Sequence, residues 1–183
     1  MQTRVIYIPG LGDHYDGFRK FTLKWWTLLG VRATHVPITW YDGGDFEQKI
    51  GLVTQAIEAH RAERIVVIGE SAGGALALHA ATNPNVSRVI TLCGVASRST
   101  PISAYLEKRA PALVAAARTI PDVSNYDIHS VRAYIDPVVS AKYNRAKGAK
   151  VYTLPLIGHF IPIVLCLTIL APLMVTIAKK SKT

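Results

Sequence analysis

Six short runs of mainly β-branched and aliphatic residues recur along the 183-residue chain, separated by longer stretches. Each run is continuously apolar rather than alternating, which is typical of strands buried on both faces of a parallel sheet. Repeated β-α-β units of this kind form a doubly wound α/β sheet with right-handed crossovers. A chain of this length suits one domain, whose core needs no disulfide or metal. The predicted strands are Val5–Ile8, Thr34–Ile38, Ile65–Ile68, Val89–Leu92, Val131–Ile135 and Val151–Leu154.

The segments between these runs have the pattern of helices. Phe21, Trp25 and Leu28 recur at three- to four-residue spacing, which places them on one helical face. Asp45, with Gln48 three residues later, resembles a capping box at the start of another helix. The predicted helices are Phe18–Leu29, Asp45–Ala62, Ser71–Thr82, Ser140–Lys147 and Ile161–Ala178.

One stretch, residues 95–130, contains no predicted strand. It contains only a helical segment near Ile102–Thr119, which includes Pro111. Such an excursion leaves the carboxyl ends of the strands, where ligands bind in α/β sheets. We therefore expect one domain over residues 1–183, with a small lid formed by residues 95–130.

The most specific motif is Gly69-Glu70-Ser71-Ala72-Gly73, between a predicted strand and an Ala/Leu-rich helix. The pattern G-x-S-x-G alone is a weak signal, but strand, sharp turn and helix form the setting of a nucleophile elbow. The helix N-terminus adds partial positive charge where an oxyanion would form. The alternatives are a turn with a capping serine and a phosphate-binding loop, and the latter lacks a lysine after the glycines.

A serine nucleophile requires a base, and the base requires an orienting carboxylate. Of the six histidines, His159 follows the last predicted strand, at the sheet edge where Ser71 is expected. Asp136 directly follows another strand, whereas Asp122 and Asp127 precede that strand at its wrong end. The predicted catalytic residues are therefore Ser71, Asp136 and His159.

The glycine-rich turn Pro9-Gly10-Leu11-Gly12 follows the first strand and could direct backbone N–H groups toward the serine. We predict the backbone N–H groups of Leu11 and Ala72 as oxyanion donors; an ordinary βα turn is the alternative. Trp40 and Tyr41 equally suit substrate contact and core packing. The candidate substrate-binding residues are Gly10, His14, Trp40 and Tyr41.

Four motifs together resemble those of small α/β-hydrolases over nearly the whole chain. They are Pro9-Gly10-Leu11-Gly12, Gly69-Glu70-Ser71-Ala72-Gly73, Ile135-Asp136-Pro137 and Gly158-His159-Phe160. The chain is most similar to the minimal, nearly capless kind, such as the retinoblastoma-binding serine hydrolases. The resemblance implies an α/β-hydrolase fold with a minimal six-stranded parallel sheet in the order 2-1-3-4-5-6 and helices on both faces. It also implies a serine hydrolase that acts without a cofactor.

The predicted reaction is hydrolysis of a carboxylic ester, or of a thioester or amide, through an acyl-enzyme on Ser71. The expected partner is a small-molecule ester or acyl substrate. The alternative is an inactive binding protein of the same fold, with or without membrane association. Two cysteines exclude a four-cysteine zinc site, and we predict no metal.

The formal net charge of +9 is concentrated near the C-terminus. Residues 137–183 carry seven Lys or Arg and no Asp or Glu, whereas the first 136 residues carry 14 basic and 12 acidic residues. Because the excess is local and no basic stripe with interleaved aromatics accompanies it, we predict no nucleic-acid binding.

Residues 161–178 contain no charge and precede three lysines within residues 179–182. This length is borderline for a bilayer span, and Pro162 and Pro172 interrupt it. We expect an apolar C-terminal helix over residues 161–178, buried against the sheet; contact with or anchoring in a membrane is the alternative. The absence of a visible secretory signal predicts a cytoplasmic location.

Overall fold

The protein, described here by a computed structural model over residues 2–180, is built around one six-stranded parallel sheet. The strand order is β2-β1-β3-β4-β5-β6, which confirms the predicted topology. The strands are β1 (Thr3–Ile8), β2 (Arg32–His35), β3 (Arg64–Glu70), β4 (Val86–Leu92), β5 (Ile128–Ile135) and β6 (Lys150–Ile157). The α-helices are α1 (Asp16–Trp25), α2 (Phe46–Glu58), α3 (Gly73–Ala80), α4 (Ala104–Arg109), α5 (Pro111–Arg118), α6 (Phe160–Leu167) and α7 (Ala171–Lys179).

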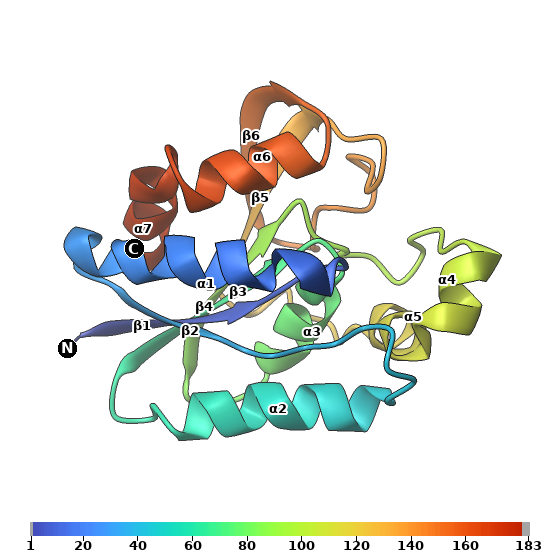
Figure 1. Ribbon diagram of the computed structural model, residues 1–183, viewed down its shortest axis with the longest axis horizontal. Coiled ribbons are helices and arrows are strands. Elements are labelled where there is room, and N and C mark those ends of the chain that lie inside the picture. The colour runs from blue at the N-terminus through green and yellow to red at the C-terminus, as the bar shows by residue number, and fades with distance from the viewer. Residues whose placement is uncertain (1, 181–183) are drawn as a thin grey trace.

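Helices cover both faces of the sheet, as Figure 1 shows. On one face α1, the short 3₁₀-helix Trp26–Leu29, α6 and α7 bury one core cluster; on the other face α2, α3 and α5 bury a second. In β1, Val5 and Tyr7 belong to the first cluster, and Ile6 and Ile8 to the second. Because both faces of this strand are buried, its sequence is continuously apolar.

The predicted C-terminal helix 161–178 is wrong as a single element, because it is two helices. α6 ends at Leu167, α7 begins at Ala171, and the pair is bent by 72°. Pro172 has no N–H to donate to the carbonyl of Thr168, and its ring would collide with that carbonyl in a continuous helix. Pro162 lies in the first turn of α6, where backbone N–H groups have no helical acceptor, and is tolerated there.

Residues of α6 and α7 contribute to the core as predicted, including Ile163, Cys166 and Met174. No single helix within residues 2–180 has the length and hydropathy to cross a membrane, although α6 and α7 together pass that test as a bent pair. Lys182, part of the predicted basic tail, lies outside the described residues.

The predicted lid over residues 95–130 requires correction. α5 packs Leu113 and Ala116 into the core between α2 and α3, and residues 128–130 begin β5. α4 alone among the helices of this segment buries no residue. The break between α4 and α5 is at Ala110, because Pro111 starts a new helix.

The predicted helix Ser140–Lys147 is also wrong, because this segment forms turns. Asn144 is fully buried, and its side-chain amide donates to the carbonyl of Val139. A side chain that bonds to nearby backbone offers the chain an alternative to helical hydrogen bonds.

Candidate active site

Ser71 occupies the turn between β3 and α3 and has a positive φ of 47°. A non-glycine residue in this region is strained, and such strain recurs at functional sites. The turn is fixed by its backbone: the N–H of Ser71 donates to Leu92, and its carbonyl accepts from Gly74 and Val95. The serine is therefore held between the end of a buried strand and the N-terminus of a helix.

Glycines around Ser71 permit this turn by close packing. A Cβ at Gly69 would lie 2.3 Å from the carbonyl oxygen of Gly73, and a Cβ at Gly73 would lie 2.4 Å from the carbonyl oxygen of Ile8. A Cβ at Gly10 would lie 2.7 Å from Cβ of Ser71 itself. The small residues of both sequence motifs are thus required because β1, β3 and α3 meet here at backbone contact.

His159, Ser71 and Asp136 form a chain of hydrogen bonds. Nε2 of His159 lies 2.8 Å from Oγ of Ser71, and Nδ1 of His159 lies 2.8 Å from Oδ2 of Asp136. The other oxygen of the buried Asp136 carboxylate accepts the backbone N–H groups of Val138 and Val139, each at 2.9 Å. With Nδ1 donating to the carboxylate, Nε2 is free to accept the serine proton.

Three strands bring this chain together from separate parts of the sequence. Ser71 follows β3, Asp136 follows β5, and His159 follows β6 and precedes α6. Parallel strands end at one edge of the sheet, so residues just past their carboxyl ends are neighbours.

The turn after β1 lies against the serine through Gly10. Within residues 2–180, the backbone N–H groups of Leu11 and Ala72 donate to no other protein group. Both N–H groups are therefore available to an oxygen bound beside Ser71, as an oxyanion hole requires.

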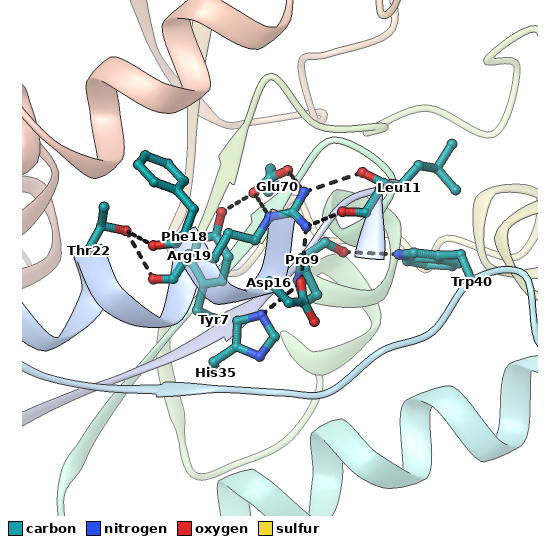
Figure 2. A network of polar contacts seen from close by, with 11 residues as sticks. Tyr7, Pro9, Leu11, Asp16, Phe18, Arg19, Thr22, His35, Trp40 and Glu70 are labelled. Carbon is teal, nitrogen blue, oxygen red and sulfur yellow. Dashed lines mark hydrogen bonds and ion pairs between the residues drawn. The ribbon is translucent and has the colours of Figure 1, made fainter. Parts of the chain in front are cut away.

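A buried ionic network supports this turn and was not predicted from the sequence (Figure 2). Arg19, on α1, donates to both carboxylate oxygens of Glu70, at 2.9 and 2.5 Å, and Tyr7 donates to one of them. The same guanidinium donates to the carbonyls of Gly12 and Leu11, at 2.9 and 3.3 Å. Glu70 directly precedes Ser71, so one cation connects the serine turn to the glycine-rich turn.

The protonation states of this network follow from burial and charge. Burial and the neighbouring Glu70 carboxylate raise the pKa of Tyr7 well above its ordinary value, so its hydroxyl remains a donor. Burial lowers the pKa of Arg19, but its bond and attraction to Glu70 outweigh burial and raise the pKa overall. The only sequence signal for the network was a charged residue beside the serine in an otherwise small and apolar motif.

The structure places the four predicted substrate-binding residues in different environments. Gly10 contacts Ser71. His14 is exposed, and its ring centroid lies 3.9 Å from that of Tyr15. The Tyr15 ring in turn packs on Phe160, the residue after His159. Trp40 is fully buried, and its indole N–H donates to the carbonyl of Pro9, so its assignment to substrate contact is wrong. The flat indole fills the core and fixes the glycine-rich turn from behind.

Tyr41 is partly exposed, as a rim residue would be. Partial burial raises its pKa, and the neighbouring Tyr105 of α4 and Asp13 raise it further. Its hydroxyl is therefore neutral near neutral pH and borders the protruding helix α4.

Burial also determines the state of the two thiols and of candidate metal ligands. Cys93 and Cys166 are buried and unpaired with each other, and burial raises the pKa of each thiol to about 12. Both are protonated at neutral pH and unsuited to nucleophilic attack. No cluster of His, Cys, Asp or Glu within the described part of the chain could hold a metal ion.

Solved structures share this fold over nearly the whole chain. A metagenome-derived lipolytic enzyme superposes with a TM-score of 0.68 at 12% identity, covering 98% of this chain and 94% of that one. A pyrethroid hydrolase from Sphingobium faniae has a TM-score of 0.66 at 16% identity, covering 96% and 97%. A hydrolase of the α/β superfamily from Xanthomonas campestris has a TM-score of 0.60 at 15% identity, covering 94% and 98%. The fold is thus that of the α/β-hydrolases.

No protein-family profile and no curated protein sequence matches this chain.

Proposed function

We propose that this protein is a serine hydrolase that cleaves carboxylic ester bonds of small molecules. The observation that carries the proposal is the position of His159, hydrogen-bonded to Ser71 through one ring nitrogen and to Asp136 through the other. This arrangement activates a hydroxyl that is otherwise a weak nucleophile. The positive φ of Ser71 at a strand-to-helix turn is a second, independent support.

In the proposed reaction, Nε2 of His159 accepts the proton of Ser71 as Oγ attacks the substrate carbonyl carbon. The oxyanion of the tetrahedral intermediate accepts the N–H groups of Leu11 and Ala72. His159 then returns the proton to the leaving alcohol, and the acyl-enzyme is formed. Asp136 holds the imidazole in its tautomer and stabilises its charged form, and water completes the hydrolysis with His159 as base.

Thioesters and amides react by the same steps, so the preference among ester, thioester and amide bonds depends on the residues around the opening of the site. Gly10, His14 and Tyr41 are the candidate rim residues. Within residues 95–127, α4 is the helix that buries no residue, so little of this segment covers the carboxyl edge of the sheet. An open edge of this kind suits small substrates that reach Ser71 directly from solvent. We further propose kinship with the retinoblastoma-binding serine hydrolases, supported by the four shared motifs, and a cytoplasmic location, supported by two unpaired cysteines.

The test is labelling by a fluorophosphonate probe together with hydrolysis of p-nitrophenyl esters of increasing acyl length. Wild type and Ser99→Ala, which alters an exposed serine, should label and turn over ester. Ser71→Ala should do neither while keeping its circular dichroism spectrum. A folded wild-type protein that neither labels nor hydrolyses any ester would instead identify a binding protein of this fold.

A further inference from the structure

Large apolar side chains gather on the surface where α1 and its 3₁₀ extension lie beside the turn between α6 and α7. Leu28 and Ile169 are each 75% exposed, Phe21 is 59% exposed and Trp25 is 57% exposed. These four side chains line one cleft of about 380 Å³, together with Leu29, Leu167 and Pro172. We call the four residues, with the neighbouring exposed Phe18, the apolar ridge.

The geometry of α1 shows that the apolar ridge is separate from the core. At about 100° per residue, Phe18, Phe21 and Trp25 fall within a stripe about 60° wide. The buried residues Arg19, Thr22 and Leu23 lie on the adjoining face, whose centre is about 120° around the helix from that of the stripe. The stripe is therefore an additional apolar face directed to solvent, and contiguous exposed patches of this kind mark interaction sites.

Charge around the apolar ridge has one sign. Lys24 is exposed on α1 about 60° around the helix from Phe21, on the side away from the core, and Lys20 is exposed about 40° beyond it. A second cleft, which shares Leu29 and Pro172 with the first, is lined by Lys179 and Lys180 at the end of α7. The segments that build this surface, residues 16–41 and 137–180, contain one acidic residue, Asp16, which pairs with the buried Arg19.

We propose that the apolar ridge docks on the surface of a lipid bilayer that contains anionic lipids. Trp, Phe and Leu side chains enter the interface between headgroups and acyl chains, while flanking lysines pair with anionic headgroups. The charge pattern favours this partner, because an apolar surface flanked by the exposed Lys24, Lys179 and Lys180 is complementary to an anionic plane. The proposal goes beyond hydrolysis and does not depend on it.

Docking in this manner is peripheral. α6 and α7 would keep their buried residues in the core, and only their connecting turn and the lysines at the end of α7 would reach the lipid. Phe18 is the end of the apolar ridge that lies towards the candidate active site. It is three residues after Tyr15, whose ring packs on Phe160, the residue next to His159. A bound molecule would therefore have its candidate active site next to the lipid surface.

The test is flotation of the full chain with phosphatidylcholine vesicles and with vesicles that also contain phosphatidylglycerol. The protein should float with the anionic vesicles and remain behind with the neutral ones. Raising the salt to about 1 M should weaken binding, because it screens the lysines. Ser71→Ala should bind like wild type, which separates this result from the fate of the catalytic proposal.

Variants locate the contact. Phe21→Ser and Lys24→Glu should each weaken binding about tenfold, since an interfacial ring or a lysine-lipid contact contributes enough for such a change. Tyr126→Ser, which removes an exposed ring from another surface, is the matched control and should bind normally. Thermal melting of each variant verifies that it is folded.

Trp25 supplies an internal reporter, because it is the exposed member of the three tryptophans, Trp26 and Trp40 being buried. Its fluorescence should shift to the blue with anionic vesicles, and the shift should vanish in Trp25→Phe. Two results would each overturn the proposal: no flotation of wild type with anionic vesicles, or equal binding by folded Phe21→Ser. A third would be a wild-type protein that is dimeric and does not bind vesicles and that Phe21→Ser makes monomeric, because the apolar ridge would then be a dimer interface.

Discussion

Ser71 and His159 lie 88 residues apart in the chain, yet Oγ of one and Nε2 of the other are 2.8 Å apart. The contact depends on β3 and β6, which occupy different positions in one parallel sheet and end at the same edge. Asp136 completes the chain of hydrogen bonds from β5, the neighbour of β6.

Asp136→Asn should reduce kcat for ester hydrolysis by about 10³–10⁴-fold. An amide nitrogen placed toward Nδ1 of His159 favours the opposite tautomer, in which Nε2 carries a proton and cannot accept one. Steady-state kinetics measure the effect. Asp122→Asn, at an exposed aspartate, is the control, and equal loss in both variants would contradict the role of Asp136.

Gly69→Ala should destabilise the protein by about 2–4 kcal/mol, because its methyl group would collide with the carbonyl of Gly73. Gly51→Ala, in α2, meets no atom within 4 Å and should stabilise the protein by about 1 kcal/mol. Urea denaturation of both variants measures these changes. Similar effects of the two substitutions would show that the turn at Ser71 tolerates a Cβ.

Glu70→Gln should destabilise the protein by about 3 kcal/mol, the lower end of the range for breaking a buried pair, because the buried Arg19 would remain charged with only Asp16 as its counter-ion. Glu63→Gln, which breaks the more exposed pair with Arg4, should change stability by only about 0–1 kcal/mol. Urea denaturation compares the two variants. A Glu70→Gln protein as stable as wild type would mean that Asp16 and solvent together stabilise the Arg19 charge without Glu70.

Replacing both charges should separate stability from activity. Arg19→Met with Glu70→Met removes the unpaired charge and should recover part of the stability lost in Glu70→Gln. The carbonyls of Leu11 and Gly12 would lack their donor, so kcat should be lower than that of wild type although the protein melts cooperatively. Full recovery of kcat would show that Arg19 does not position the glycine-rich turn.

Stability should fall as the pH is lowered through about 6.5, the ordinary pKa of histidine. Burial first, and then the charge of Arg88, lower the pKa of His129 in the folded protein. Its neutral ring donates to Asp127 and accepts from Tyr152, at 3.0 and 3.1 Å. The unfolded chain therefore binds more protons below pH 6.5, and the contribution of the neutral His129 is present above that pH and lost below it.

Urea denaturation at pH 7.5 and pH 5.5 checks this prediction, with His129→Gln as the comparison. His35 and His79, whose pKa values are also lowered mainly by burial, act in the same direction. The pH dependence of the variant should therefore be smaller than that of wild type but not absent. An unchanged dependence would indicate that His129 is charged in the folded state.

Local chemistry in the sequence was sufficient to predict the strands and the strand-to-helix turn at Ser71, whereas the strand order came from the resemblance to small α/β-hydrolases. Continuous apolar runs are required wherever both faces of a strand are buried, and small residues are required wherever backbones touch. Both requirements act on residues that are adjacent in the chain, so they can be recognised from the sequence without a structure. The positions of Asp136 and His159 followed from the same rule, since each comes just after a predicted strand.

What the tertiary structure alone decided depends on residues far apart in the chain. Trp40 reads equally as a rim or a core residue, and its burial behind Pro9 depends on how the segment after β2 crosses β1. The partners of Arg19 lie up to 51 residues away, so no local pattern predicts the pair with Glu70. The apolar ridge likewise depends on which helix faces the packing against the sheet leaves exposed. The sequence by itself determined which residue types follow each strand, and packing decided which of them meet, because contact between distant segments is set by the whole fold.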